Sequence, residues 1–301
     1  IKVDNSPSKL CFMPSELPKP ASELESIWKA LVLGLRDYVQ KNGFPGVILG
    51  LSGGVDSALT LALAVDALGP ERVQAIMMPF RYTSKISIED AKEQSENLGV
   101  KLKTISIEAV YETFMGSLSD EFSNLPTDST EENLQARCRG VILMSISNKK
   151  GLLVLTTGNK TEIAVGYSTL YGDMAGGFDV LKDVPKMLVY ELCKYRNRIS
   201  ECIPARVLDR PPSAELAPDQ RDQDSLPPYP ILDRILELYI EKDQSLDDIV
   251  SQGYASEYVE KAIRLVDQNE YKRRQSPIGV RISKKGFGRD RRYPITSSWT
   301  R

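Results

Sequence analysis

A short polar stretch, residues 52–57, interrupts an apolar sequence and carries side chains that could do chemistry. Its residues are Ser52, Gly53, Gly54, Val55, Asp56 and Ser57. Glycines let backbone N–H groups approach an anion closely, and the start of a following helix adds partial positive charge. Ser52 and Ser57 add hydroxyl donors, and Asp56 fits beside a phosphate if it holds a Mg²⁺ ion that bridges to it. The stretch predicts a phosphate-binding loop with a metal ligand, and a tight turn capped by Asp56 is the alternative.

Two other loops of similar composition are excluded by single features of the chain. Residues 50–54 match the G-x-S-x-G elbow of serine hydrolases, but that chemistry needs a histidine and the chain has none. A Walker loop needs a lysine after the last glycine, where this chain has Val55. The absence of histidine also excludes imidazole as a base, a proton shuttle or a metal ligand.

Strands that alternate with helices are expected to position this loop. Apolar runs predict strands at 47–51, 73–79, 100–107 and 152–156. Periodic patterns predict helices at 23–41, 56–68, 87–97 (capped by Ser87), 130–147, 184–199, 231–242 and 255–274. This order predicts an α/β fold with a doubly wound, mainly parallel sheet flanked by helices, and with extra helices at the C-terminus.

Two loops of such a fold are expected to face one crevice. In a doubly wound sheet, ligands bind at the carboxyl ends of the strands. Residues 52–57 follow the first strand and residues 156–162 follow the fourth. A segment with six prolines, 210–230, is expected to be a long irregular loop, which is typical of functional or disordered regions.

The composition limits the classes of protein to consider. The chain of 301 residues is 41% hydrophobic and has a formal net charge of −2, so it lacks the overall basic character of nucleic-acid binders. Residues 272–301 nevertheless carry a net charge of +9, which suggests a local anionic ligand. Four cysteines without a C-x-x-C pattern indicate a reducing compartment, and we expect a cytoplasmic location. No stretch has the length and apolar character to span a membrane.

The first residues are expected to lie outside the folded domain. Residues 1–22 contain four prolines and are interpreted as a linker-like leader, and 23–301 as one domain. The chain begins Ile-Lys-Val without a methionine or a signal peptide, so we expect a piece of a longer protein.

The motif S-G-G-x-D-S after a strand resembles the pyrophosphate loop of the N-type ATP pyrophosphatases. These enzymes cleave ATP between the α and β phosphates and adenylate a substrate. The motif is shared by NAD⁺ synthetase, GMP synthetase, asparagine and argininosuccinate synthetases, and tRNA-thiolating and tRNA-lysidine enzymes.

Further segments resemble NAD⁺ synthetase in particular. They are NLQARCRG (133–140), the segment 155–186, PSAEL (212–216), DSLPPY (224–229), YKRRQSP (271–277) and FGRDRRYPIT (287–296). The resemblance runs from about residue 23 to the C-terminus, and the basic tail with the S-L-P-P-Y loop is more similar to the synthetase domain of the glutamine-dependent enzymes. It implies the amidation of deamido-NAD⁺ by ammonia, with ATP as co-substrate and an acyl-adenylate intermediate. The glutaminase of that family is absent here, so either this is an excised synthetase domain or ammonia comes from solution.

The resemblance implies three sets of site residues, of which some overlap. Those for ATP are Gly50, Leu51, Ser52, Gly53, Gly54, Val55, Asp56, Ser57, Arg137 and Thr157. Those for deamido-NAD⁺ are Asn133, Glu162, Tyr167, Ser168, Thr169, Leu170 and Lys272. Asp56 and Glu162 would hold Mg²⁺, and the catalytic residues would be Ser52, Asp173 and Lys186.

The catalytic residues have separate expected roles. Ser52 would help to hold the departing pyrophosphate. Asp173 would hold or deprotonate the ammonium that becomes the nucleophile, since a carboxylate can do this without histidine. Lys186, like Lys272, would meet phosphate and carboxylate groups. Some ammonia-dependent members have a histidine before the second of these lysines, where this chain has Tyr271, so the carboxamide contact stays open.

The resemblance also implies a homodimer and two loops, 82–88 and 210–228, that order over the substrates. Two other functions stay open. A tRNA-modifying relative would explain the basic tail, but no C-x-x-C and no RNA-binding module accompany it, so nucleic acid is not expected. A non-catalytic adenine-nucleotide sensor would need neither Asp56 nor Glu162.

Overall fold

The computed structural model describes residues 20–218 and 220–296, so nearly all of the expected leader, with Cys11, lies outside the described residues. The elements are α1 (Glu23–Lys41), β1 (Val47–Gly50), α2 (Val55–Leu68), η1 (Pro70–Arg72), β2 (Val73–Met77), α3 (Lys85–Asn97), β3 (Lys101–Thr104), α4 (Glu108–Ser117), α5 (Ser129–Lys150), β4 (Leu153–Thr156), α6 (Lys160–Val165), β5 (Phe178–Asp179), α7 (Lys186–Ile199), α8 (Ala205–Asp209), η2 (Asp222–Asp224), α9 (Tyr229–Leu236), the π-helical η3 (Glu237–Glu241), α10 (Leu246–Ser251), α11 (Ser256–Gln268) and α12 (Glu270–Arg273).

The strands form one parallel sheet in the order β3-β2-β1-β4-β5. The first strand lies at the centre, where Val47 is in register with Val73 of β2 and with Leu153 of β4. The chain runs outward from β1 in one direction and returns to its other side at β4, so the strand order reverses there. The predicted α/β fold with a doubly wound parallel sheet is confirmed, and the reversal point is where such folds bind ligands.

Alternate residues of the strands face two different helix layers. Leu49 and Ala75 belong to the core beneath α1, α2 and α7, whereas Ile48 and Ile76 belong to the core beneath α4 and α5. Because the sheet is covered on both faces, its central strands are continuous apolar runs. Helix α2 packs between the sheet and α1 and α7, which explains why it is apolar nearly all round.

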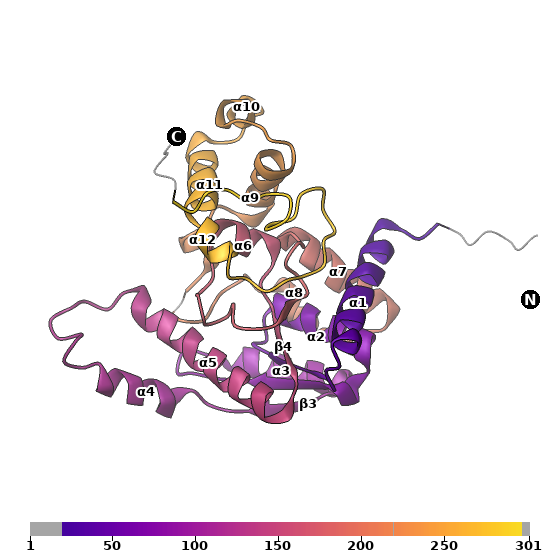
Figure 1. Ribbon diagram of the computed structural model, residues 1–301, viewed down its shortest axis with the longest axis vertical. Helices are drawn as coiled ribbons and strands as arrows, with labels where there is room; N and C mark the ends of the chain where they lie inside the picture. The colour runs from indigo at the N-terminus through magenta and orange to yellow at the C-terminus, as the bar shows by residue number, and fades with distance from the viewer. Residues whose placement is uncertain (1–19, 219, 297–301) are drawn as a thin grey trace, which may run out of the picture.

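The C-terminal helices form a third layer with their own core. Figure 1 shows α9, α10 and α11 gathered at one end of the molecule, away from α4 and α5. These helices pack with α6 around buried residues such as Leu232, Ile249 and Ile263. The extra C-terminal helices are thus confirmed. The chain then returns to the sheet, where the Asp179 N–H donates to the Ile278 carbonyl at 2.8 Å.

Several sequence-based boundaries were wrong for identifiable reasons. Helix α3 is capped by Ser84 rather than Ser87, because the Ser84 hydroxyl accepts the Ser87 N–H at 3.1 Å. Half of the expected 82–88 loop is therefore the first turn of α3. Strand β5 is two residues long, too short to show a period, and α4 and α10 were also missed.

The basic tail is partly matched by acidic residues of the chain itself. Arg273 pairs with Glu270 at 3.0 Å, and Arg291 pairs with Asp267 at 3.3 Å. Lys285 also pairs with an aspartate in the C-terminal layer. These contacts give part of the tail's charge a role in attaching it to the helices.

None of the described helices has both the length and the apolar character needed to cross a membrane.

Candidate active site

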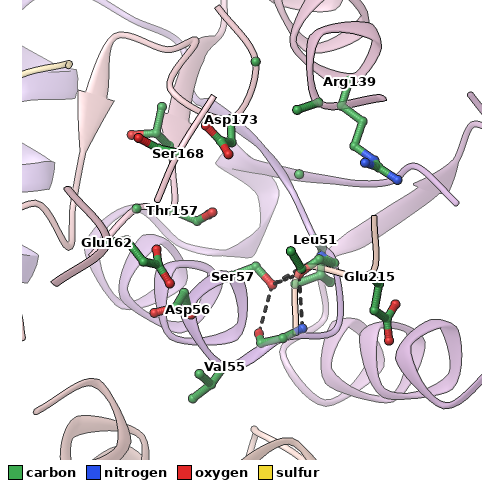
Figure 2. Close-up of a pocket in the computed structure, with 18 of the residues that line it drawn as sticks. Leu51, Val55, Asp56, Ser57, Arg139, Thr157, Glu162, Ser168, Asp173 and Glu215 are labelled. Atoms are coloured by element: carbon green, nitrogen blue, oxygen red, sulfur yellow. Dashed lines mark hydrogen bonds between the residues drawn. The ribbon is translucent and has the colours of Figure 1, made fainter. Parts of the chain in front are cut away.

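A cavity of about 340 Å³ opens at the carboxyl ends of β1 and β4, where the crevice was predicted. It is also lined by α5, by the N-terminal end of α7 and by the proline-rich segment that follows α8. The predicted site residues in its walls are Gly50, Leu51, Ser52, Gly54, Val55, Asp56, Ser57, Thr157, Glu162, Tyr167, Ser168, Asp173 and Lys186. Figure 2 shows Asp56 and Glu162 next to each other on one side of the cavity, with Arg139 and Glu215 on the other side of the view.

The predicted phosphate loop is held by hydrogen bonds among its own small residues. The Ser52 and Ser57 hydroxyls lie 3.0 Å apart, and the Gly54 N–H donates to the Ser52 hydroxyl at 3.2 Å (Figure 2). The Ser57 hydroxyl also donates to the Gly54 carbonyl at 3.0 Å. Helix α2 begins directly after this loop, so its unpaired N–H groups and positive end face the cavity. This is the geometry that binds phosphate oxygens.

The loop requires glycine at position 53. Its φ angle is +82°, in the left-handed region, and a Cβ there would lie 2.3 Å from the Ser87 carbonyl oxygen. The loop thus passes close to the first turn of α3. The Gly53 carbonyl accepts a hydrogen bond at 2.9 Å from Arg210, at the C-terminal end of α8.

Two carboxylates share one buried ammonium group beside the loop. Lys186 Nζ lies 2.5 Å from Asp56 Oδ2 and 3.1 Å from Glu162 Oε1. Burial alone would lower the pKa of Lys186, but the charges of Asp56 and Glu162 outweigh it, and the pKa is raised. Burial raises the pKa of Glu162, with Asp56 adding to the effect and Lys186 opposing it. The predicted metal pair and the predicted catalytic lysine are therefore one cluster.

Local capping places Glu162 in this cluster. Asn159 caps α6, and its side chain accepts the Glu162 N–H at 3.0 Å while donating to Asp56 Oδ1 at 2.8 Å. The neighbouring Lys160 is buried and pairs with Asp183 at 3.0 Å and Glu241 at 2.8 Å. The start of α6 is thus attached to α2 on one side and to the C-terminal layer on the other.

The two carboxylates suit Mg²⁺ better than a metal held wholly by protein. Among residues 20–218 and 220–296, no three Asp, Glu, Cys or His side chains converge on a possible metal position. Mg²⁺ prefers oxygen ligands and is commonly held by one or two carboxylates together with substrate phosphates and water. Asp56 and Glu162 already converge on a cation, next to a loop shaped for phosphate, so the residues fit this mode.

Asp173 occupies another part of the cavity. Its side chain is exposed to the cavity, and Oδ1 accepts the Thr169 N–H at 2.8 Å. Burial by the surrounding protein raises the pKa of Asp173 to about 6, against the opposing effects of the Thr169 hydrogen bond and Lys272. A carboxylate that is ionised at neutral pH but easily protonated is suited to hold or accept a proton.

Six predicted site residues do not line the cavity: Gly53, Asn133, Arg137, Thr169, Leu170 and Lys272. Most of them lie in or contact the segment 166–173, of which Tyr167, Ser168, Gly172 and Asp173 line the cavity. Thr169 donates to Asn133 Oδ1 at 2.7 Å, and the exposed Arg137 donates to the Leu170 carbonyl at 3.2 Å. Lys272 donates to the carbonyls of Gly166 and Ser168 at 2.7 and 2.8 Å. Their assignment to ligands stays a prediction.

Sequence reasoning missed Arg139, which lines the cavity where Arg137 does not. Its Nε donates to the Met78 carbonyl at 3.1 Å, and it forms no ion pair with a carboxylate of the described chain. Burial lowers the pKa of Arg139 to about 10, so it stays charged at neutral pH. The motif NLQARCRG contains both arginines, but only the orientation of α5 shows which one faces inward.

The proline-rich segment also contributes residues that were not predicted. Glu215 accepts the Ser87 hydroxyl at 2.7 Å and the Ser84 N–H at 3.3 Å, so it contacts the N-terminal end of α3. Arg210 donates to the Ser87 hydroxyl at 3.0 Å as well as to the phosphate loop. The segment 210–216 therefore covers the cavity and joins the loop to α3.

Known proteins share both the sequence and the fold. The chain is 61% identical over 285 residues to a glutamine-dependent NAD(+) synthetase of Acinetobacter baylyi, which covers 94% of this chain and 53% of that protein. A solved glutamine-dependent NAD⁺ synthetase from Acinetobacter baumannii, in complex with ADP, is 56% identical with a TM-score of 0.65, over 95% of this chain and 52% of that one. An NMN synthetase from Francisella tularensis is 28% identical with a TM-score of 0.71, over 84% and 96%.

The chain spans about half the length of the curated relatives it matches. The sequence model of the NAD synthase family matches residues 27–276 and so includes the phosphate loop, the carboxylate pair and Asp173. The chain belongs to the NAD synthase family.

Proposed function

We propose that this chain is a ligase that forms a C–N bond, converting deamido-NAD⁺ to NAD⁺ with ATP and ammonia, the final step of NAD⁺ biosynthesis. The observation that carries the proposal is that the phosphate loop and the adjoining Asp56–Lys186–Glu162 cluster line the same cavity. Relatives named glutamine-dependent NAD(+) synthetase and a neighbour in complex with ADP support it.

The residues suggest how the first half of the reaction proceeds. The nicotinate carboxylate attacks the α-phosphorus of ATP, and pyrophosphate leaves. Ser52, Ser57 and the backbone amides at the start of α2 hold the departing pyrophosphate. Asp56 and Glu162 would hold Mg²⁺, which when bound supplies positive charge to the phosphate oxygens. Lys186 keeps the two carboxylates together and prevents their mutual repulsion.

The second half is the attack of ammonia on the acyl adenylate, with AMP leaving. Asp173 holds the ammonium ion and accepts its proton, which frees the nitrogen lone pair for attack. Residues 210–216 and the helices around the cavity exclude water, which would otherwise hydrolyse the adenylate. The predicted contacts of Thr157, Tyr167 and Ser168 with the nucleotides belong to the same proposal.

The proposal extends to the organisation of the protein. Residues 23–301 would act as one synthetase domain, in a cytoplasmic homodimer, with ammonia from solution or from a glutaminase domain outside this chain. The support is that the chain matches about half of relatives that are named glutamine-dependent. Sedimentation of the purified chain, with and without ATP, tests the dimer.

The test of function is pyrophosphate release from ATP and Mg²⁺, with deamido-NAD⁺ and ammonium chloride added or omitted. We expect release that depends on deamido-NAD⁺, and NAD⁺ as product only with ammonium. Nicotinate mononucleotide serves as a comparison substrate, because one structural neighbour is named an NMN synthetase. Release that requires tRNA instead, or ATP binding without release, would contradict the proposal.

A further inference from the structure

The start of α7 is capped by side chains of two other helices. Pro185 precedes α7, and its side chain forms no capping hydrogen bond. The first N–H groups of a helix have no partner within the helix itself. Here the Thr161 hydroxyl of α6 accepts the Lys186 N–H at 3.0 Å. The carboxylate of Asp233, in α9, accepts the Met187 N–H at 2.8 Å. The first turn of α7 is therefore held by α6 and α9 together.

The two capping side chains also contact each other. The Thr161 hydroxyl donates to Asp233 Oδ1, while Oδ2 of the same carboxylate accepts the Met187 N–H. The hydroxyl thus accepts from α7 and donates to α9, so its orientation is fixed from both sides. A carboxylate at this end of α7 also complements the partial positive charge of the helix start. Neither Thr161 nor Asp233 lines the cavity, so we expect neither to touch a reactant.

Helix α9 contacts the same lysine at a second point. Tyr229 and Asp233 are four residues apart, so they lie on one face of α9. The centroid of the Tyr229 ring lies 5.1 Å from Lys186 Nζ, a contact that favours the charged ammonium group. The opposite side of α9 is anchored in the core of the C-terminal layer through residues such as Leu232 and Ile235. This layer therefore contacts Lys186 near its backbone and at its ammonium group.

We propose that Thr161 and Asp233 are positioning residues for Lys186. By fixing the first turn of α7, they place the ammonium group between the carboxylates of Asp56 and Glu162. Lys186 is the first residue of α7, so a shift of this turn moves its side chain directly. Its ammonium group lies 2.5 and 3.1 Å from the two carboxylates, and such contacts are lost when the group moves by about 1 Å. The inference rests on the proposed function and adds to it a role for the C-terminal layer.

A purely structural role for the two capping side chains predicts a different behaviour. The loss of a helix cap destabilises the chain whatever residues lie in the active site. A positioning role acts through Lys186, so its effect on the reaction must disappear when the lysine is removed. A double-mutant cycle measures this dependence, because the effects of residues that act through one another do not add.

The test combines Thr161→Val, which keeps the shape of the side chain, with Lys186→Met. In the wild-type background, Thr161→Val should slow single-turnover pyrophosphate release by about 10- to 100-fold, as expected for a small misplacement of a site residue. In the Lys186→Met background, the same change should slow it by less than about twofold. Thr161→Ser retains the hydroxyl and should restore most of the rate. A similar slowing by Thr161→Val in both backgrounds would overturn the inference.

A second measurement does not depend on turnover. Magnesium chloride should raise the melting temperature of Thr161→Val more than that of the wild type, because a displaced lysine leaves the two carboxylates less neutralised. In the Lys186→Met background, Thr161→Val should add nothing to this rise. The matched control is Ser245→Ala, which removes the cap of α10 in the same layer, where Ser245 accepts the Asp248 N–H at 3.2 Å. It should lower the melting temperature without changing the effect of magnesium.

The outcomes of these measurements separate the inference from the proposed function. An equal effect of magnesium in the wild type and Thr161→Val, or an effect in Ser245→Ala as large as in Thr161→Val, would contradict the inference. If Thr161→Val does not fold, Asp233→Ala takes its place in both experiments. Wild-type chain that makes no NAD⁺ would refute the proposed function, whereas the melting temperatures would still decide whether the caps position Lys186.

Discussion

Lys186 Nζ lies within 3.1 Å of both Asp56 and Glu162, so one buried cation bridges two carboxylates from the first turns of α2 and α6. The lysine is 2% exposed and enters from the first turn of α7. The cluster retains one net negative charge when all three groups are ionised. That charge can attract a divalent cation, while the lysine prevents the two carboxylates from repelling each other before the metal arrives.

Replacing this lysine tests the arrangement directly. Lys186→Met keeps the approximate volume but leaves two partly buried carboxylates without their shared cation, so the free energy of unfolding should fall by about 3–5 kcal/mol. Magnesium chloride should recover more stability in the variant than in the wild type, because the ion replaces the missing charge. Denaturant unfolding with and without magnesium measures both effects.

The control for that variant is Lys41→Met, which removes an exposed partner of Asp37. A surface pair of this kind contributes about 0.3–0.5 kcal/mol, and magnesium should have no specific effect. Equal stabilisation by magnesium in the wild type, Lys186→Met and Lys41→Met would contradict a metal role for Asp56 and Glu162.

The Ser52 hydroxyl is expected to contribute to the rate of pyrophosphate release rather than to the stability of the fold. Its hydroxyl lies between the Ser57 hydroxyl and the Gly54 N–H, at the position where pyrophosphate would leave. Ser52→Ala should slow pyrophosphate release by about 10²–10³-fold, which is typical for one lost donor at a developing charge. Asp56→Ala should be slower still and should need more magnesium for half-maximal rate. Single-turnover release of pyrophosphate, measured over a series of magnesium concentrations, distinguishes the effects of the two variants. A normal rate for Asp56→Ala would exclude Asp56 as a metal ligand.

The pH dependence should follow Asp173. Because its pKa is raised to about 6, the carboxylate is ionised above that pH and protonated below it. The value of kcat/KM for ammonium should therefore fall as pH decreases through about 6, since a neutral acid neither holds ammonium nor accepts its proton. Asp173→Asn should be slow at every pH and should lack this step. A wild-type profile without a step near pH 6 would assign the proton transfer to another group.

The sequence was sufficient to predict the sheet edge and its phosphate loop, because both depend on local patterns. The strand at 47–51 is an apolar run, and the glycines and serines that follow it have few other uses. Glu162 was also placed in the crevice, because a residue just after a parallel strand must lie at the carboxyl edge.

Other features depend on contacts between distant segments and could not be predicted. Asp179 lies on a two-residue strand that has no period of its own and is fixed by pairing with β4 and with Gly279. Arg137 and Arg139 have the same chemistry, and only the packing of α5 decides which of them lines the cavity. The sharing of Lys186 between two carboxylates required the position of α7, which is set by its packing on α1 and α2.

Gly53 offers a test of the loop that separates backbone strain from function. Gly53→Ala would place a methyl group 2.3 Å from the Ser87 carbonyl oxygen in addition to the strain of a φ angle of +82°. The loop must move to relieve this contact, so the N–H groups that face the cavity lose their alignment. We expect pyrophosphate release to fall by at least about 10²-fold, comparable to the loss of one aligned donor.

Gly43→Ala is the matched control for Gly53→Ala. Gly43 has a similar φ angle of +75°, but an added Cβ meets no atom within 4 Å, and the residue follows α1 and does not line the cavity. Its stability should fall by about 1–2 kcal/mol from backbone strain alone, with normal kcat. Melting temperature and pyrophosphate release, measured on both variants, distinguish the two causes. If both variants lose stability and neither loses activity, the loop does not need the backbone geometry that places its N–H groups toward the phosphate.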